Sequence, residues 1–255
     1  PTADEAGQMR QLMAESMEDG AFGVSSALIY PPDAFTSTDE WVDICRVVNR
    51  YHGLYITHVR SEADDIFNAY EEAFNIGRRA DVPVEIYHMK AAGRRNWGKI
   101  ERVIEMIDGA RSSGLDVTAD MYPYDASGTG LTSVLPPWAA ANGLLYERLE
   151  DPEQRDAIRV ATLNPEATWE AMVDLNGPDG VMPIGFQQPE NTHFAGMRLS
   201  EIAAHLHMDW FDAVCHLLLS ERQRISTVYY AMSEDNLRLQ LTQPWIKIST
   251  DAGGF

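Results

Sequence analysis

Short apolar runs and amphipathic segments alternate regularly through the first half of the chain, and this pattern restricts the possible folds. Each apolar run is rich in strand-forming residues, and each segment that follows repeats its apolar residues at helical spacing. The predicted strands are 20–32, 54–60, 82–90 and 115–124, and the predicted helices between them are 36–53, 62–81 and 96–114. Apolar strands that alternate with helices are typical of a parallel sheet covered by helices.

The remaining elements are predicted from the same patterns. Further helices are predicted at 4–19, within 150–175 and, as a pair, within 199–221; further strands are predicted at 181–187, 226–232 and 244–251. Asp209 stands where it would cap the second helix of the pair, and Ser37 or Thr38, with Glu40 close behind, would begin helix 36–53. No glycine-rich phosphate loop is present, so a (β/α) barrel fits better than a nucleotide-binding sheet. We expect residues 1–255 to form one domain.

Composition excludes several classes of function. The formal net charge of −19 disfavours a nucleic-acid partner, and no apolar run approaches the roughly 20 residues that span a bilayer. The two cysteines, Cys45 and Cys215, fit no disulfide or metal framework and are expected to be buried, which favours a reducing compartment such as the cytoplasm. The chain begins without methionine and stops just after an apolar run, so we expect it to be part of something longer.

Polar side chains stand at the end of successive predicted strands. His58 and His88 each end an apolar run, 30 positions apart, and each is followed two residues later by a cation, Arg60 or Lys90, expected on the same strand face. Taken alone, each histidine could equally be a core residue that donates a hydrogen bond to a carbonyl or a metal ligand. As a pair on adjacent parallel strands, about 5 Å apart, they favour a shared metal ion, and zinc accepts histidine nitrogen readily.

Other strand ends add groups that suit hydrolysis. Asp251 follows the last predicted strand and precedes glycines; it either caps a turn or takes a proton from a metal-activated water. His205 and His207 look like a metal-binding pair, but they lie in a helical pattern, where residues two apart point in nearly opposite directions. We therefore expect both to be structural, together with the remaining histidines.

Several motifs together resemble the N-acyl-D-amino-acid deacylases of the metal-dependent amidohydrolase superfamily. The similar stretches are "GVSSALIYPP", "LYITHVRSE", "VEIYHMKAAGRRNWGK", "DVTADMYPYDASGTGL", "LPPWA" and "QPWIKISTD". The resemblance implies a (β/α)8 TIM-type barrel, usually with a small β-sandwich. It also implies that this chain is a partial barrel: the first strands with their HxH motif, the metal ligand that follows, and the terminal sandwich are not in the sequence.

The resemblance assigns roles residue by residue. His58 and His88 would bind one or two zinc ions, and Asp251 would contact the metal site and act as general base and acid. The substrate carboxylate would be held by Lys90, Tyr122 and Tyr30, with Ser127 or Thr129 adding a hydroxyl.

The implied function is zinc-dependent hydrolysis of N-acyl-D-amino acids to a carboxylate and a free D-amino acid. Alternatives are hydrolysis of a cyclic amide, such as a hydantoin, hydrolysis of a dipeptide, or a non-catalytic barrel subunit. The expected partners are a small carboxylate substrate and either a second copy of the chain or the missing segments, with no nucleic acid or membrane.

Overall fold

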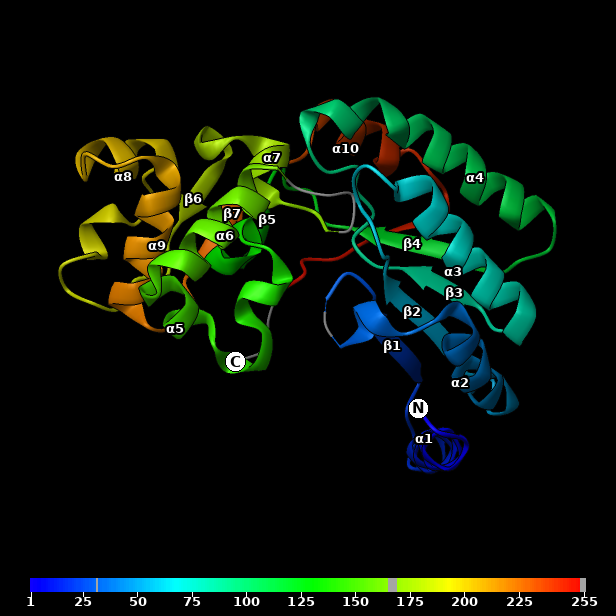
Figure 1. Ribbon diagram of the computed structural model, residues 1–255. Helices are drawn as coiled ribbons and strands as arrows, with labels where there is room; N and C mark the ends of the chain where they lie inside the picture. Colours follow the sequence, from blue (N-terminus) through cyan, green and yellow to red (C-terminus); the bar gives the residue numbers. More distant parts are fainter. Residues whose placement is uncertain (31, 165–168, 253–255) are drawn as a thin grey trace. The chain divides into compact units, whose positions relative to one another are not determined.

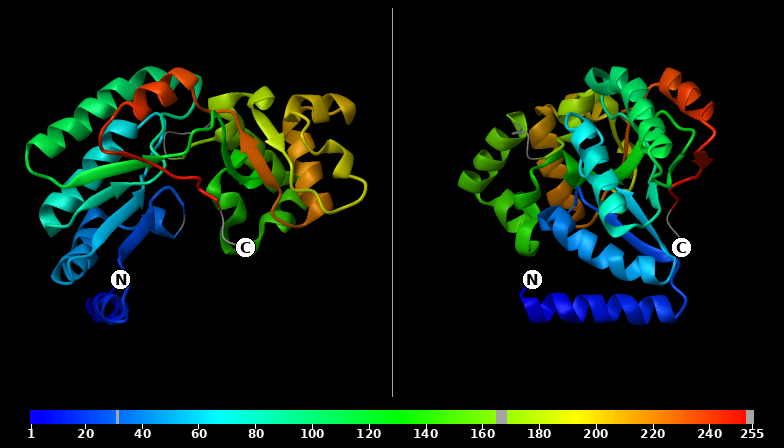
Figure 2. Two further views of the ribbon diagram at one scale, coloured as in Figure 1. Left: turned by 180° about the vertical axis from the view of Figure 1, so that it is seen from behind. Right: turned by 90° about the vertical axis from the view of Figure 1, so that its right-hand side faces the viewer.

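The computed structural model describes residues 1–30, 32–164 and 169–252 (Figures 1 and 2). The chain divides into two compact units. The first unit comprises Pro1–Ala91, Gly98–Pro123 and Asp235–Phe255, and the second comprises Ala92–Trp97 and Tyr124–Glu234. The prediction that residues 1–255 form one domain stays a prediction.

The first unit is built on a five-stranded parallel sheet. Its strands are β1 (Gly23–Ala27), β2 (Leu54–His58), β3 (Val84–Ile86), β4 (Val117–Met121) and β8 (Ile246–Ile248), in the order β1-β2-β3-β4-β8. The register pairs Ala27 with His58 at the carboxyl ends of β1 and β2. Every neighbouring pair is parallel, which confirms the predicted α/β class and agrees with part of a (β/α) barrel.

Helices connect these strands and cover the sheet. They are α2 (Thr38–Arg50), α3 (Ile66–Ala80), α4 (Ile100–Ser112) and α10 (Glu234–Leu241), and α1 (Ala3–Glu18) precedes β1. Figure 1 shows α2, α3 and α4 along the same face of the sheet. Their apolar stripes pack on the strands, and the core between them includes Tyr55, Phe74, Ile86 and Ile107. Ser37 caps α2 in a capping box with Glu40, as the sequence predicted.

The strands end earlier than the apolar runs indicated. β2 ends at His58 and β3 at Ile86, so Arg60 and Lys90 lie in loops. The prediction that each cation shares a strand face with the preceding histidine was therefore wrong. The reason is that the chain leaves extended conformation after β3: the φ angle of His88 is 35°, in the left-handed region.

The second unit contains a three-stranded antiparallel sheet. Its strands are β5 (Ser127–Gly130), β6 (Val181–Pro183) and β7 (Ser226–Tyr229), in the order β5-β7-β6. The surrounding helices are α5 (Leu145–Glu150), α6 (Pro152–Leu163), α7 (Met172–Asn176), α8 (Leu199–His205) and α9 (Trp210–Glu221). The helix pair at 199–221 and the cap by Asp209 were predicted, whereas the antiparallel pairing was not.

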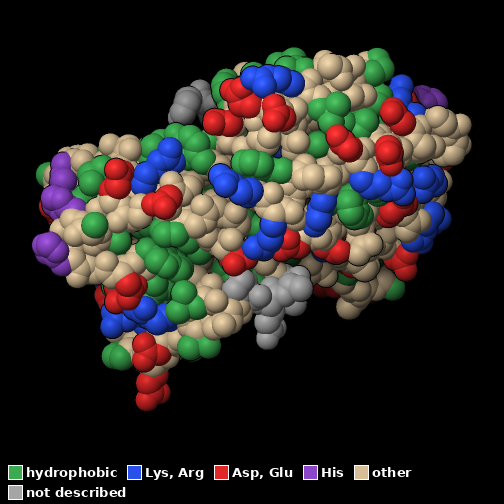
Figure 3. All heavy atoms as spheres, turned by 90° about the horizontal axis from the view of Figure 1, so that it is seen from above, with side chains coloured by type: hydrophobic (Ala, Val, Ile, Leu, Met, Phe, Trp, Pro, Cys, Tyr) green, Lys and Arg blue, Asp and Glu red, His purple; other side chains and the backbone are tan. Residues whose placement is uncertain are grey.

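Short 3-10 helices complete the described secondary structure, at Asp33–Phe35, Arg94–Lys99, Leu131–Val134, Pro137–Gly143, Pro178–Gly180 and Thr192–Phe194. Cys45 and Cys215 are free and buried, as predicted. Across the part of the chain that the structure describes, no helix has the length and apolarity needed to cross a membrane. Figure 3 shows acidic and basic side chains interspersed over one face of the molecule.

Candidate metal centre

The two strand-end histidines meet at the carboxyl edge of the parallel sheet. His58 is the last residue of β2, and His88 follows β3 by two residues. Nδ1 of His58 lies 3.0 Å from Nε2 of His88, and the two ring centroids are 4.6 Å apart. The adjacency of these histidines, which the sequence predicted from the spacing of one βα unit, is therefore present.

Neighbouring strands fix the backbone of His88. Its N–H donates to Oδ1 of Asp120 at 2.9 Å, and the N–H of Met89 donates to the Asp120 carbonyl at 2.7 Å. The same Asp120 oxygen accepts from the Ser249 hydroxyl at 2.7 Å. Asp120 thus ties the backbone of His88, in its left-handed conformation, to β4.

A third potential ligand, Glu62, was not predicted as one. Its Oε1 lies 2.9 Å from Nδ1 of His88 and 2.7 Å from Nζ of Lys90, and its Oε2 lies 3.8 Å from Nε2 of His58. Among the described residues, His58, Glu62 and His88 are the group whose ligand atoms converge, all within 4.8 Å of one another. The sequence pattern placed Glu62 at the start of helix 62–81, whereas α3 begins at Ile66 and Glu62 lies in the preceding loop.

The protonation states suit metal binding. Burial lowers the pKa of His58 to about 4, so its imidazole is neutral at pH 7. Burial by itself would raise the pKa of Glu62, but the nearby His58, Lys90 and His88 outweigh it and hold that pKa below its ordinary value. A neutral imidazole and an ionised carboxylate are the forms that ligate a cation.

The donor set also fits zinc. Nε2 of His58 is buried and has no hydrogen-bond partner within the described part of the chain, which is costly unless another group satisfies it. Two imidazoles and one carboxylate are ligands that zinc commonly takes. The residues present therefore fit a Zn²⁺ ion, and the buried, unpartnered Nε2 of His58 offers it a point of attachment.

Three of the predicted substrate-binding residues lie around the histidines. The Lys90 ammonium is 2.6 Å from Nδ1 of His88 and 5.2 Å from the centre of the Tyr122 ring. The rings of Tyr30 and His58 are 5.4 Å apart. Tyr122 is buried, and burial, together with the charge of Glu62, raises the pKa of its phenol, so the hydroxyl stays neutral and can donate.

Three further predicted residues are not part of the converging ligand group among the described residues. Asp251 follows β8, is exposed, and is not part of the converging group of His58, Glu62 and His88. It is close enough to Tyr122 for its charge to contribute to the raised pKa of that phenol. Ser127 begins β5, and Thr129 lies on the same strand. The roles of Asp251, Ser127 and Thr129 stay predictions.

The structural role expected of the other histidines stays a prediction, and the structure places two of them at the end of α8. His205 is the last residue of α8, and His207 lies in the turn that follows, with a φ angle of 55°. Neither belongs to the converging ligand group among the described residues. The rings of His193 and His205 lie 5.4 Å apart and both contact Phe194, which is an aromatic packing arrangement.

Comparison with known proteins identifies relatives of this fold and site. No family model matches the chain. Its structure is similar to that of N-acyl-D-glutamate deacylase from Bordetella bronchiseptica, solved with zinc and a phosphonate inhibitor that mimics the tetrahedral intermediate. That match has 26% identity and a TM-score of 0.74, and covers 98% of this chain and 43% of the other. A D-aminoacylase with a binuclear metal centre matches with 28% identity and a TM-score of 0.70, covering 98% of this chain and 43% of the other.

Fold and site therefore define the class: the structural neighbours are metal-binding deacylases of the amidohydrolase superfamily. Relatives found by sequence narrow this class further. The D-aminoacylase of Alcaligenes xylosoxydans xylosoxydans is 42% identical over 130 residues, which are 51% of this chain and 27% of that protein. N-acyl-D-glutamate deacylase of the same organism is 29% identical over 238 residues, 93% of this chain and 39% of that protein. The chain is thus a homologue of the N-acyl-D-amino-acid deacylases, and it spans between about a quarter and two fifths of their length.

Proposed function

We propose that the protein hydrolyses the amide bond of N-acyl-D-amino acids in a zinc-dependent reaction that yields a carboxylate and a free D-amino acid. The observation that carries this proposal is the converging group of His58, Glu62 and His88, with a buried, unpartnered imidazole nitrogen. Relatives named as D-aminoacylase and as D-aspartate and D-glutamate deacylases support the substrate class. On this proposal both units belong to one catalytic barrel domain.

His58 and His88 would hold one or two zinc ions, with Glu62 as a further ligand and Asp251 at the edge of the site. When bound, Zn²⁺ lowers the pKa of a coordinated water from 15.7 to roughly 7 and polarises the carbonyl that is attacked. Lys90 and Asp120 keep the ligands in place, because Lys90 donates to Glu62 and Asp120 accepts from the backbone of His88. Such partners behind the ligands fix their orientation.

Asp251 would be the general base. Asp251 is exposed and follows β8, and its charge contributes to the raised pKa of Tyr122, which supports a place beside the substrate site. It would accept the proton of the water as the bond to the amide carbon forms. It would then return that proton to the amine as the amide bond breaks, so the carboxylate is regenerated.

Lys90, Tyr122 and Tyr30, with Ser127, would bind the substrate carboxylate. Tyr122 keeps its proton, so its hydroxyl can donate to an anion, and the cation of Lys90 favours negative charge in a protein whose net charge is −19. Fixing this carboxylate orients the amide toward the catalytic groups. The free, buried cysteines support a cytoplasmic location, and a second copy or further segments of the same protein are the proposed macromolecular partners.

Metal analysis combined with stereospecific assays tests the proposal. The intact protein should hold close to stoichiometric zinc and hydrolyse N-acetyl-D-amino acids in preference to the L forms. His58→Ala and His88→Ala should lose both zinc and activity, whereas His216→Ala, an exposed histidine on α9, should keep both. Zinc binding that survives both ligand substitutions would remove the metal assignment, and activity toward L substrates alone would remove the substrate assignment.

A further inference from the structure

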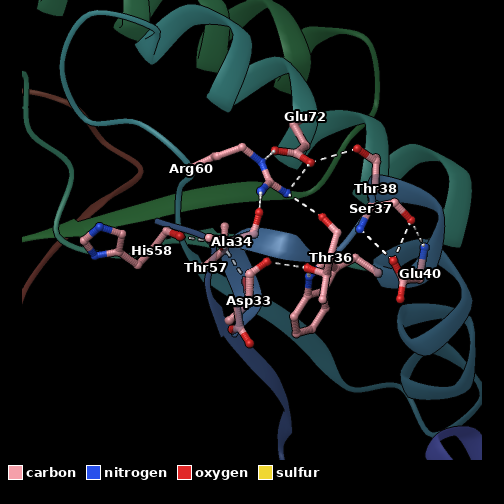
Figure 4. A network of polar contacts seen from close by, with 12 residues as sticks. Asp33, Ala34, Thr36, Ser37, Thr38, Glu40, Thr57, His58, Arg60 and Glu72 are labelled. Atoms are coloured by element: carbon pink, nitrogen blue, oxygen red, sulfur yellow. Dashed lines mark hydrogen bonds and ion pairs between the residues drawn. The ribbon is translucent and has the colours of Figure 1, made fainter. Parts of the chain in front are cut away.

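Arg60 follows the candidate metal ligand His58 by two residues, yet it does not take part in the metal group. Figure 4 shows the imidazole of His58 and the guanidinium of Arg60 pointing away from each other. Nε and Nη2 of Arg60 donate to the two carboxylate oxygens of Glu72 on α3, at 2.8 and 3.0 Å. The guanidinium is thereby anchored to the helix in a two-point arrangement with a fixed direction.

The rest of the guanidinium binds the connection between β1 and α2. Nη1 donates to the carbonyl of Ala34 at 3.0 Å, and Nη2 donates to the carbonyl of Thr36 at 3.1 Å (Figure 4). The Glu72 carboxylate adds a second link to the same region, because its Oε1 accepts from the Thr38 hydroxyl at 2.8 Å. One arginine and one glutamate thus tie α3 to the segment that leads into α2.

This connection carries Tyr30. The N–H of Ala34 donates to the carbonyl of Tyr30 at 2.9 Å, so the turn that Arg60 holds is joined directly to the tyrosine backbone. At the other side, Oδ2 of Asp33 accepts from the N–H of Ala27 at the end of β1, at 2.9 Å. Tyr30 is 44% exposed, so core packing alone does not fix it, and the polar contacts of the connection contribute to its position.

We propose that Arg60 is a positioning residue that holds Tyr30 beside His58 and thereby sets the affinity of the site for the substrate carboxylate. This inference rests on the proposed function, in which Tyr30 binds that carboxylate. The geometry points to a role exerted through Tyr30, because the guanidinium contacts Glu72 and two carbonyls of the connection. Its effect should therefore appear in substrate binding, with the metal content unchanged.

The chemistry requires arginine in particular. The three nitrogens of the planar Arg60 guanidinium form a fork and donate four hydrogen bonds. Their acceptors are on α3 and on the connection between β1 and α2. A lysine ammonium has the same charge, but it is a point donor and cannot reproduce this fork. Arg60→Lys should therefore no longer hold the connection that carries Tyr30 in place, although the lysine is still attracted to Glu72.

The experiment compares Arg60→Lys and Arg60→Met with Arg79→Met in the intact, zinc-loaded protein. Arg79 is a matched control, because its 2.6 Å ion pair with Asp39 also joins α3 to α2 but does not touch the connection that carries Tyr30. Both Arg60 variants should raise KM by about tenfold with a much smaller change in kcat and unchanged zinc content. Arg79→Met should leave KM unchanged.

A double-mutant cycle with Tyr30→Phe tests whether Arg60 acts through Tyr30. The KM of the double variant should not exceed the higher of the two single-variant KM values. The reason is that the Arg60 substitution and Tyr30→Phe weaken the same contact with the substrate. Additive effects on KM, or a KM that does not change in the Arg60 variants, would overturn the inference.

Hydrogen exchange provides a readout that does not depend on the substrate. Amides in residues 28–37 should exchange faster in Arg60→Met and Arg60→Lys than in the Arg79→Met control, and unchanged exchange would also overturn the inference. If the unmodified protein hydrolyses no N-acyl-D-amino acid, the proposed function is refuted, and the exchange rates still decide whether Arg60 holds the connection.

Discussion

Replacing Glu62 by glutamine removes a negative charge that the structure places against the Lys90 ammonium and both histidines. Lys90 is 6% exposed and its Nζ lies 2.7 Å from Oε1 of Glu62. Glu62→Gln keeps the shape of the side chain and leaves an amide oxygen that can still accept from Lys90. The substitution therefore isolates the charge of Glu62 from its volume.

The size of the effect follows from the distance. Two unit charges 2.7 Å apart attract each other by about 6 kcal/mol at an effective dielectric constant of 20. The glutamine amide recovers part of this attraction, and the cost of burying the carboxylate disappears. A net loss of about 3 kcal/mol in the free energy of unfolding remains, at the lower end of the range for removing one partner of a buried pair.

The assay is urea-induced unfolding of the metal-free protein, followed by circular dichroism and extrapolated to water. Glu71→Gln is the control, because its pair with Arg78 on α3 is 3.7 Å long and largely exposed, and should be worth less than about 1 kcal/mol. Zinc titration of the same variants measures the second consequence, which is a weaker affinity for the ion. A Glu62→Gln protein as stable without metal as the Glu71→Gln protein would refute the electrostatic account of this site.

Two further predictions concern stability away from the metal group. A Cβ on Gly23 would lie 2.0 Å from the carbonyl oxygen of Leu54, so Gly23→Ala should displace β1 from β2 and lower the free energy of unfolding by at least about 1–3 kcal/mol. Gly109 on α4 has open space around it, so Gly109→Ala should be neutral or stabilising. Thermal unfolding of the two variants checks this difference. Burial alone would raise the pKa of Glu221, but hydrogen bonds, that from Asn191 foremost, hold it below its ordinary value. Because the folded-state pKa is depressed, this stabilisation is complete above the unfolded-state pKa of about 4.5 and is lost as pH falls through the folded-state value; Glu221→Gln should cost about 1.5–3 kcal/mol at pH 7 and flatten the acid limb of the stability curve.

The local elements of the first unit could be predicted because periodicity reports which side of an element is buried. The apolar stripe of α3 and the capping box of α2 are both encoded within a few residues. The antiparallel sheet of the second unit could not be predicted in the same way. Its strands are three or four residues long, too short for alternation to specify a partner or a direction.

In the candidate site, too, residues at strand ends could be predicted and residues in loops could not. The meeting of His58 and His88 was predictable, because consecutive parallel strands bring their carboxyl ends to one edge and the two histidines are one βα unit apart. Glu62 was missed because its direction depends on the path of a loop. Arg60 and Lys90 were placed on strands because apolar character continues beyond the last residue that is hydrogen-bonded in the sheet.

The α/β class, the positions of most helices and strands, the pair of histidines and the relationship to D-amino-acid deacylases could all be inferred from the amino-acid sequence. These follow from local periodicity and from motifs that are contiguous in the chain. The three-dimensional structure was needed to show that Glu62 joins the histidines, whereas Arg60, two residues before it, points away and binds the connection that carries Tyr30. In a loop, the direction of a side chain is set by partners distant in the sequence, here Lys90 for Glu62 and Glu72 for Arg60, and no local pattern records them.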